Sequence, residues 1–253
     1  MKEFESLKEK CLYYRSKYDT ALEDPQGHTL VMLDGRSFSK LIKKKYKLPF
    51  DEKFIDLMNQ TASYLAKNVQ GTRIGYVQSD EITLYLRPKT EVSDVFFKGR
   101  IEKLLSIIPS MASGFFNMKA HLGETEEYEP IQFDCKVWQV PDLNDVIAWF
   151  LYRQNDCVRN SKNQAAQTYI SHNQLRRKTA DEAIKLLEEE KGIKWDDYSP
   201  GEKYGRFITK KSELYKNEEM NIEYTRTFWD PIDGFRLDTP SRREELKKII
   251  EDN

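Results

Sequence analysis

The sequence predicts an α+β fold of the ferredoxin-like type. Along the first 140 residues, apolar runs and amphipathic segments alternate in the order strand, helix, paired strands, helix, strand. This β-α-β-β-α-β order is typical of ferredoxin-like domains, whose antiparallel sheet carries packed helices. Beyond residue 140 the apolar spacing becomes mainly helical. We therefore expect a main region over 1–140 and a mainly helical extension over 141–253, integrated into one domain.

The first elements follow from local spacing and composition. Residues 3–21 place apolar side chains at helical intervals, and residues 28–33 form an unbroken apolar run that is typical of a strand buried on both faces. A short helix is expected over 37–45. Asp51 can cap the next helix, whose apolar residues recur every three or four positions until Gly71 ends it.

The middle of the chain predicts a hairpin, a helix and a strand. Apolar runs on both sides of a polar turn indicate paired strands within 74–86. A long helix is expected over 93–116, bent or divided by Pro109. Residues 131–137 alternate between polar and apolar side chains, which indicates a strand. Its polar positions are Gln132, Asp134 and Lys136.

The extension predicts charged helices with two short strands between them. One long helical stretch covers 143–170, and a further charged helix covers 179–191. Short strands are expected over 203–209 and 221–228, followed by a last helix over 241–253.

Composition limits the class of protein. The 253 residues carry a formal net charge of −1, so any polyanion must be held by local basic patches. The three cysteines, Cys11, Cys135 and Cys157, lack zinc-ligand spacing and are expected to be reduced thiols of a cytoplasmic protein. No apolar run approaches the roughly 20 residues of a membrane span, and residues 1–6 are too polar for a signal peptide.

Two carboxylates at strand ends are the most informative functional signal. Asp34 follows the first apolar run and Asp80 lies in the hairpin turn, so both are expected at one edge of the sheet. Their oxygens, with the carbonyl oxygen of Gly35, suit a hard divalent cation. Glu81 points to the opposite face from Asp80 and is expected to orient the site or to accept from a nearby base or lysine. The alternative is that both aspartates only cap a helix or a turn.

Phosphate-binding candidates stand beside these carboxylates. Residues 35–39 open a helix, whose first backbone N–H groups form a phosphate cradle, with Arg36, Ser37 and Ser39 as further donors. The basic run over 43–47 is close in sequence. A second basic set opens the helix after the hairpin: Lys98, Arg100 and Lys103. The alternatives are an ordinary capped helix and solvated charged faces.

A third basic region, rich in amide side chains, begins inside the helix expected over 143–170. Its cations are Arg153, Arg159, Lys162, Arg176, Arg177 and Lys178. Cations and amides on one helix suit the backbone and base edges of a nucleic acid, although a polar helix at a subunit interface has the same pattern.

Together these residues resemble the tRNA-histidine guanylyltransferase family, most closely its Thg1-like branch of 3′–5′ RNA polymerases. The motifs that carry the resemblance are Leu33–Phe38, Gln78–Glu81, Phe96–Phe97 with Lys103–Leu104, Phe133–Asp134 with Val137, and Phe150–Cys157. They span roughly the first two-thirds of the chain, and their ordered combination is specific.

The resemblance implies a polymerase palm that holds two Mg²⁺ ions on Asp34, Asp80 and the Gly35 carbonyl, with Asp34, Asp80 and Glu81 as catalytic residues. It implies ATP and GTP as activating and substrate nucleotides, tRNA as the partner, no membrane, a homotetramer and a cytoplasmic location. The nucleotide-binding residues implied are Gly35, Arg36, Ser37, Phe38, Ser39, Lys47, Ser79, Arg100 and Lys103. The RNA-binding residues implied are Arg153, Arg159, Asn160, Lys162, Arg176 and Lys178.

The sequence also departs from the family pattern. After Asp156-Cys157, true guanylyltransferases carry His-Ile-Asn-Asn-Leu-Tyr-Asn, whereas residues 158–164 of this chain keep only Asn160. Leu48 stands where a family lysine is expected, and Lys47 is a weak substitute. These departures put dedicated guanylation of tRNA-histidine in doubt.

The activity that the resemblance implies is therefore nucleotidyl transfer to the 5′ end of truncated tRNA, templated by the opposite strand. Addition of G to tRNA-histidine stays an alternative. Two further alternatives are a palm-fold nucleotide cyclase and a non-catalytic RNA-binding palm. The basic, amide-rich helix argues against the cyclase, and the pair Asp34 and Asp80 argues against the binder.

Overall fold

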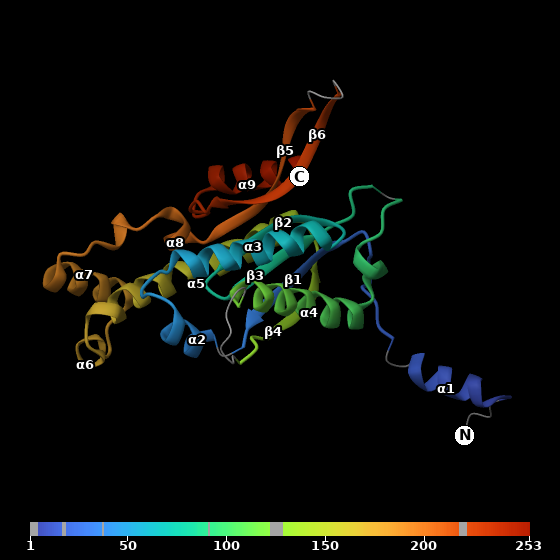
Figure 1. Ribbon diagram of the computed structural model, residues 1–253, viewed down its shortest axis with the longest axis horizontal. Coiled ribbons are helices and arrows are strands. Elements are labelled where there is room, and N and C mark those ends of the chain that lie inside the picture. Colours follow the sequence, from blue (N-terminus) through green and yellow to red (C-terminus); the bar gives the residue numbers. More distant parts are fainter. Residues whose placement is uncertain (1–4, 17–18, 37, 91, 122–128, 218–221) are drawn as a thin grey trace.

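A six-stranded antiparallel sheet with helices on both faces forms the body of the molecule in the computed structural model (Figure 1). The structure describes residues 5–16, 19–36, 38–90, 92–121, 129–217 and 222–253. The strands are β1 (His28–Gly35), β2 (Thr72–Gln78), β3 (Glu81–Leu86), β4 (Phe133–Val140), β5 (Arg206–Asn217) and β6 (Ile222–Asp233), in the sheet order β4-β1-β3-β2-β5-β6.

Helices connect these strands and cover the sheet. The α-helices are α1 (Leu7–Ser16), α2 (Phe38–Lys45), α3 (Glu52–Asn68), α4 (Ile101–Ala120), α5 (Leu143–Tyr169), α6 (His172–Leu175), α7 (Ala180–Lys191), α8 (Pro200–Tyr204) and α9 (Pro240–Asp252). Two 3₁₀ turns, η1 (Phe96–Gly99) and η2 (Trp195–Asp197), complete the set among the described residues.

The register of β1 brings the ends of three strands together. β1 pairs with β3 from Thr29 opposite Leu86 to Asp34 opposite Glu81. On its other side it pairs with β4, where Asp34 lies opposite Asp134. Side chains that are directly opposite in an antiparallel pair project from the same face. Three carboxylates therefore project from one face at one end of the sheet.

Alternation along the strands supplies two cores. Val31 and Leu33 belong to the cluster that packs against α3 and α4, whereas Leu30 belongs to the cluster with Tyr85 and with Phe150 of α5. Because successive strand residues point to opposite faces, Asp34 lies on the same face as Leu30, the face that α5 covers. The apolar pattern thereby fixes which face carries the acidic residues.

Most predicted elements are confirmed, and the differences have local causes. The helix expected over 93–116 begins only at Ile101, because Phe97 and Lys98 adopt positive φ angles of 51° and 54°. Pro109 lies inside α4 without ending it. The amphipathic pattern at the N-terminus forms the shorter helix α1, which buries none of its residues and lies away from the sheet (Figure 1).

The C-terminal strands are longer than the sequence indicated. The strands expected over 203–209 and 221–228 are β5 and β6, of 12 residues each, and Lys203 belongs to α8 instead. β5 pairs with β2 only from Arg206 to Ile208, so the rest of the hairpin extends beyond the sheet (Figure 1). In the described part of the chain, no helix is long and apolar enough to cross a membrane.

The buried pair His28 and Tyr85 predicts an acid-sensitive contribution to stability. The His28 ring and the Tyr85 hydroxyl lie 2.7 Å apart, and burial, helped by Arg87, lowers the pKa of His28. The unfolded chain then binds more protons near pH 6, so the free energy of unfolding falls as the pH drops below about 6.5. We expect urea titrations between pH 7.5 and 5 to show a smaller pH slope for His28→Gln than for the wild type. The exposed His172→Gln variant is the control; equal slopes in all three proteins would contradict the prediction.

Candidate functional site

Asp34, Asp80 and Glu81 meet at one end of the sheet, as the sequence predicts. Asp34 is the penultimate residue of β1, and Asp80 lies in the two-residue turn between β2 and β3. Ser79 shapes this turn with a φ angle of 46°. Burial, with a further contribution from the charge of Asp34, raises the pKa of Asp80 to about 6. The two carboxylates therefore share one electrostatic environment.

Asp134 adds a fourth carboxylate that the sequence did not assign to the site. It lies opposite Asp34 in the register, and burial together with the charge of Asp134 raises the pKa of Asp34. Lys136 lies on the same strand as Asp134, and its positive charge lowers the pKa of Asp34. The polar alternation over 131–137 predicted that Asp134 is a polar strand position. The sequence did not show that this strand pairs with β1, which is what places Asp134 opposite Asp34. We call Asp34, Asp80, Glu81 and Asp134 the acidic edge.

The acidic edge fits a hard, weakly chelated cation. Among the described residues, no group of three or more His, Cys, Asp or Glu side chains is arranged around a metal position. Mg²⁺ does not need such a cage, because it usually keeps several waters and binds through one or two carboxylates plus substrate phosphates. Asp34 and Asp80, with the Gly35 carbonyl, supply oxygen donors of that kind.

Glu81 differs from the two aspartates because it is already paired. Its carboxylate accepts two hydrogen bonds from Arg153 of α5, at 2.8 Å and 2.5 Å. Burial raises the pKa of Glu81, and the contacts with Arg153 oppose that shift. The structure thus supplies Arg153 as the partner of a residue for which the sequence predicted a base or lysine partner.

The turn from β1 into α2 is built around an aromatic side chain. Phe38 is 1% exposed and packs against Phe54, Phe116 and Phe133. Its ring cannot contact a nucleotide, so only its backbone can serve the predicted phosphate cradle. A Cβ atom on Gly35 would lie 2.2 Å from the Phe38 ring. Glycine is therefore required here by the protein's own packing.

Other parts of the predicted cradle are placed differently. The Arg36 N–H donates to the carbonyl of Gln132 at 2.8 Å, so this backbone group is already engaged. The Arg36 side chain is exposed and lies 3.4 Å from the Gln132 side chain. Ser37 and the side chain of Ser39 lie outside the described residues.

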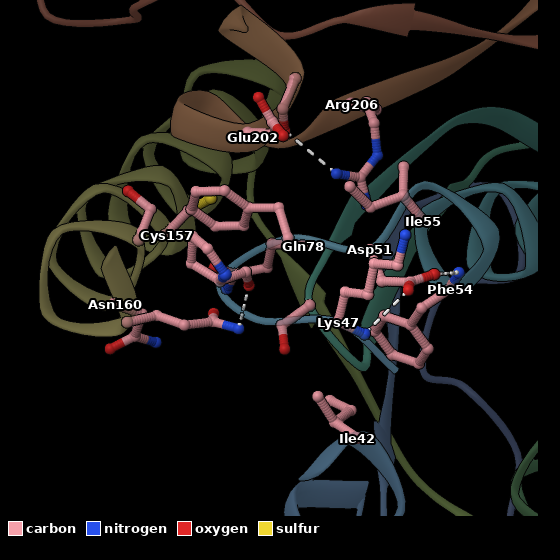
Figure 2. A pocket seen from close by; sticks show the side chains of 16 residues that line it. Ile42, Lys47, Asp51, Phe54, Ile55, Gln78, Cys157, Asn160, Glu202 and Arg206 are labelled. Atoms are coloured by element: carbon pink, nitrogen blue, oxygen red, sulfur yellow. Dashed lines mark hydrogen bonds between the residues drawn. The ribbon is translucent and has the colours of Figure 1, made fainter. Parts of the chain in front are cut away.

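A pocket opens beside the hairpin turn and gathers several of the predicted residues. Lys47, Ser79 and Asn160 line it together with apolar side chains such as Ile42 and Phe54. Figure 2 shows Lys47 and Asp51 on one side of the opening and Cys157 and Asn160 on the other. The mixture of apolar walls and polar groups suits a nucleoside next to the acidic edge.

Arg206 is a pocket residue that the sequence analysis missed. It is 6% exposed, and its guanidinium donates to the Asn59 side chain at 2.9 Å. It also donates to the Gly201 carbonyl at 3.0 Å (Figure 2). Burial lowers its pKa. Arg206 begins a strand that the sequence placed within 203–209, and nothing in the local pattern distinguishes it from a solvated strand-end cation.

The second basic set lies at the opposite end of the sheet. Asn117 and Ser113, near the C-terminal end of α4, bond to residues beside the start of β4, close to Asp34. Arg100 and Lys103 stand at the other end of this 20-residue helix, where the Arg100 side chain pairs with Asp19 and Glu102. The structure therefore does not bring Arg100 and Lys103 to the acidic edge within one chain.

The third basic region is divided between internal contacts and exposed cations. Arg153 pairs with Glu81 and Asp156, and its side chain is 14% exposed. Lys162 of α5 pairs with Asp181 of α7 and lies over the Trp195 ring, so it links α5 to α7. The more exposed cations are Arg159, which pairs with Asp156, and Arg176 and Lys178 after α6.

The contact between Gly35 and Phe38 predicts a cost for any side chain at position 35. In Gly35→Ala, the new Cβ must displace the Phe38 ring from its aromatic cluster, and we expect a loss of about 1–3 kcal/mol in the free energy of unfolding. The matched control is Gly114→Ala in α4, where a Cβ meets nothing within 4 Å and a gain of roughly 0.5–1 kcal/mol is expected. Urea unfolding measures both. A Gly35→Ala variant as stable as the wild type would refute this packing role.

The crowded acidic edge predicts that Asp80→Asn stabilises the metal-free protein. The pKa of Asp80 is raised to about 6, so its ionised form destabilises the folded state at pH 8. We expect Asp80→Asn to raise the free energy of unfolding by about 1–3 kcal/mol at pH 8 in EDTA, with the difference shrinking as the pH falls towards 4. A difference that does not change with pH would show that Asp80 acts through something other than its charge.

Comparison with known proteins shows which family this chain resembles. A sequence model described as Thg1, tRNAHis guanylyltransferase, matches residues 13–141. An uncharacterised protein of Acanthamoeba polyphaga mimivirus is 30% identical, with coverage of 88% of this chain and 83% of that protein. A probable tRNA(His) guanylyltransferase of Dictyostelium discoideum is 27% identical, covering 76% of this chain and 79% of the relative.

Solved structures share the fold. A bacterial tRNA(His) guanylyltransferase (Thg1)-like protein in complex with ATP superposes with a TM-score of 0.79 at 24% identity, covering 98% of both chains. The tRNA(His) guanylyltransferase of Saccharomyces cerevisiae superposes with a TM-score of 0.64 at 22% identity, covering 78% of this chain and 91% of the other. The fold is thus the expected palm with its added helices. Since the sequence model matches half of the chain, the protein belongs to the Thg1 family of tRNAHis guanylyltransferases and Thg1-like nucleotidyltransferases.

Proposed function

We propose that this protein adds nucleotides in the 3′–5′ direction to the 5′ end of truncated tRNA, copying the opposite strand. The observation that carries this proposal is the meeting of Asp34 and Asp80 beside a pocket lined by Lys47 and Ser79. The related bacterial protein binds ATP in one structure and GTP in another, which supports nucleotides as the occupants of this pocket. The 5′-monophosphate of the RNA first attacks the α-phosphate of ATP or GTP and releases pyrophosphate. The 3′-hydroxyl of an incoming nucleotide then attacks the activated 5′-phosphate and releases the activating nucleoside monophosphate.

The residues of the acidic edge fit two Mg²⁺ ions. Asp34, Asp80 and the Gly35 carbonyl would hold them, and the bound metal would lower the pKa of the attacking hydroxyl and neutralise charge on the phosphates. The chain's own contribution is to keep the two carboxylates at fixed strand ends and to place the pocket beside them. Lys47 adds positive charge at the mouth, and Asn160 adds a polar group on the α5 side.

The α5 segment supports templated repair over guanylation of one tRNA. Asn160, Ser161 and Gln164 all line the pocket, in the stretch where the guanylyltransferase signature is replaced. Ser161 accepts a hydrogen bond from the Trp195 indole at 3.1 Å, and Gln164 donates to the carbonyl of Pro49. These residues build the pocket wall through internal bonds. Selectivity can then come from base pairing within the RNA, which needs few protein contacts to one particular tRNA.

RNA contacts, assembly and location complete the proposal. The exposed cations Arg159, Arg176 and Lys178 are the candidates for phosphate contacts that position the tRNA without reading its sequence. A homotetramer and a cytoplasmic location are proposed from the family resemblance alone.

Removal of either aspartate should nearly abolish nucleotide addition. Asp34→Asn and Asp80→Asn each remove a charged ligand, and we expect single-turnover rates to fall by more than roughly 100-fold, because metal stabilisation of the transferring phosphate contributes several kcal/mol. Asp56→Asn, on the exposed surface of α3, is the control for a lost negative charge. Addition at the wild-type rate by a folded Asp80→Asn protein would exclude the proposed metal role.

Competition between substrates tests the choice of reaction. A 5′-truncated tRNA other than tRNA-histidine and full-length tRNA-histidine are incubated together with the protein, all four nucleoside triphosphates and Mg²⁺. Templated repair predicts faster addition to the truncated RNA, and the added nucleotide should change when the opposing base is changed. Addition of G to tRNA-histidine alone, whatever base lies opposite, would instead support the guanylyltransferase alternative.

A further inference from the structure

Glu81 occupies the middle of the acidic edge but does not present its carboxylate there. In the register it lies opposite both Asp34 of β1 and Gln78 of β2, and Asp80 is its neighbour in sequence. The residue is only 5% exposed. Both carboxylate oxygens accept from one guanidinium, that of Arg153. A two-pronged contact of this kind fixes the carboxylate in orientation as well as in distance.

Arg153 is itself held by α5. Its second terminal nitrogen donates to Asp156 at 2.6 Å, and Asp156 in turn pairs with Arg159 at 2.6 Å. The guanidinium also lies 5.9 Å and 5.2 Å from the ring centres of Trp149 and Tyr152. These contacts leave the Arg153 side chain 14% exposed and occupied by protein groups. This arrangement suits a positioning residue better than the RNA contact expected from the sequence.

The charges around Glu81 explain why such a residue is needed. Among the described residues, Glu81 is the member of the acidic edge that forms an ion pair, and its partner is Arg153. Asp34, Asp80 and Asp134 form no ion pair within this part of the chain. A free Glu81 would add one more carboxylate beside Asp34, Asp80 and Asp134, and more carboxylates raise divalent-cation affinity and draw the ion towards themselves. The ion would then sit away from the position that two aspartates and a phosphate define.

We propose that Arg153 is a positioning residue that withholds Glu81 from the divalent cation, so that Asp34 and Asp80 hold the cation without Glu81. Arg153 acts through Glu81 and touches neither nucleotide nor RNA. The inference rests on the proposed metal-dependent function of the acidic edge. It assigns to the ion pair between α5 and β3 a role in metal placement besides its role in packing.

The test uses Mn²⁺ alone as the probe and a double-variant cycle. Binding of Mn²⁺ to the full chain, without nucleotide or RNA, is followed by electron paramagnetic resonance in the wild type, Arg153→Gln, Glu81→Gln and the double variant. Arg153→Gln releases one carboxylate, so we expect Mn²⁺ to bind roughly 5-fold more tightly. The double variant has the same net charge as the wild-type pair and lacks the released carboxylate, so its Mn²⁺ affinity should return to the wild-type value.

A second readout separates this role from a purely structural one. We expect Arg153→Gln to add nucleotides more slowly than the wild type despite its tighter Mn²⁺ binding, and the double variant to be faster than Arg153→Gln. Arg242→Gln is the matched control, because Arg242 pairs with Glu245 on α9 and is not a partner of Glu81, which pairs with Arg153. Its Mn²⁺ affinity should equal that of the wild type. Urea unfolding of each variant confirms that the compared proteins are folded.

The outcomes distinguish this inference from the proposed function. Absence of Mn²⁺ binding in the wild type would overturn the metal site itself. Wild-type Mn²⁺ affinity in Arg153→Gln would overturn the inference while leaving the metal site intact. A double variant that binds Mn²⁺ as tightly as Arg153→Gln would also overturn it, because the effect would then not pass through Glu81.

Discussion

The pairing of β1 between β3 and β4 is the constraint on which the site depends. This register sets Asp34 between Glu81 and Asp134, and it ends β1 where the turn carrying Asp80 begins. A slip of one residue would turn Asp34 to the other face of the sheet. There it would enter the core that holds Val31 and Leu33, where an unpaired carboxylate is costly. The alternation of apolar side chains along β1 therefore makes a shifted register unfavourable, and this keeps Asp34 at the site.

The packing beneath β1 and α2 adds a second constraint. Phe38 enters the core directly after the strand, and this is possible because Gly35 leaves room for its ring. The chain therefore turns past the proposed metal-binding position, and the aromatic cluster around Phe38 supports this turn. Gly35 then combines two demands at one residue, the carbonyl ligand of the proposed metal site and an absent side chain for the core. Neither demand alone would show why a glycine follows Asp34.

The sequence predicts the parts of this site that depend on local order. Asp34 and Asp80 stand at strand ends, and strand ends can be located from apolar runs and turn residues. The other residues of the site are brought there by contacts between segments that are far apart in the sequence. Asp134 joins the site only because β4 pairs with β1, and Arg153 reaches Glu81 only because α5 crosses the same face. Arg206 is brought to the pocket by β5, which follows Asp34 by more than 170 residues.

Local charge patterns gave wrong predictions for basic residues whose ion-pair partners are distant in the sequence. The basic stretch of α5 has the composition of an RNA-binding helix, yet Arg153 and Lys162 are held by Glu81 and Asp181. The helix expected from residue 93 begins only at Ile101, because Phe97 and Lys98 adopt positive φ angles. Phenylalanine and lysine rarely adopt such angles, so the sequence did not indicate this break. The spacing of residues along the sequence shows which side chains share a face of a helix or strand. It does not show which other part of the protein packs against that face.

Successive turns of α5 contact different parts of the candidate site, and this separation accounts for the mixture of retained and replaced residues in the chain. Arg153 lies towards the acidic edge, while Cys157, Ser161 and Gln164 follow at intervals of about one helical turn and line the pocket. Substitution over 158–164 therefore alters the wall of the pocket without changing the carboxylates of the acidic edge. A change of selectivity can accompany unchanged phosphoryl-transfer chemistry when the two are carried by different turns of one rigid helix. The family signature can then be lost while the acidic edge is kept, as observed in this sequence.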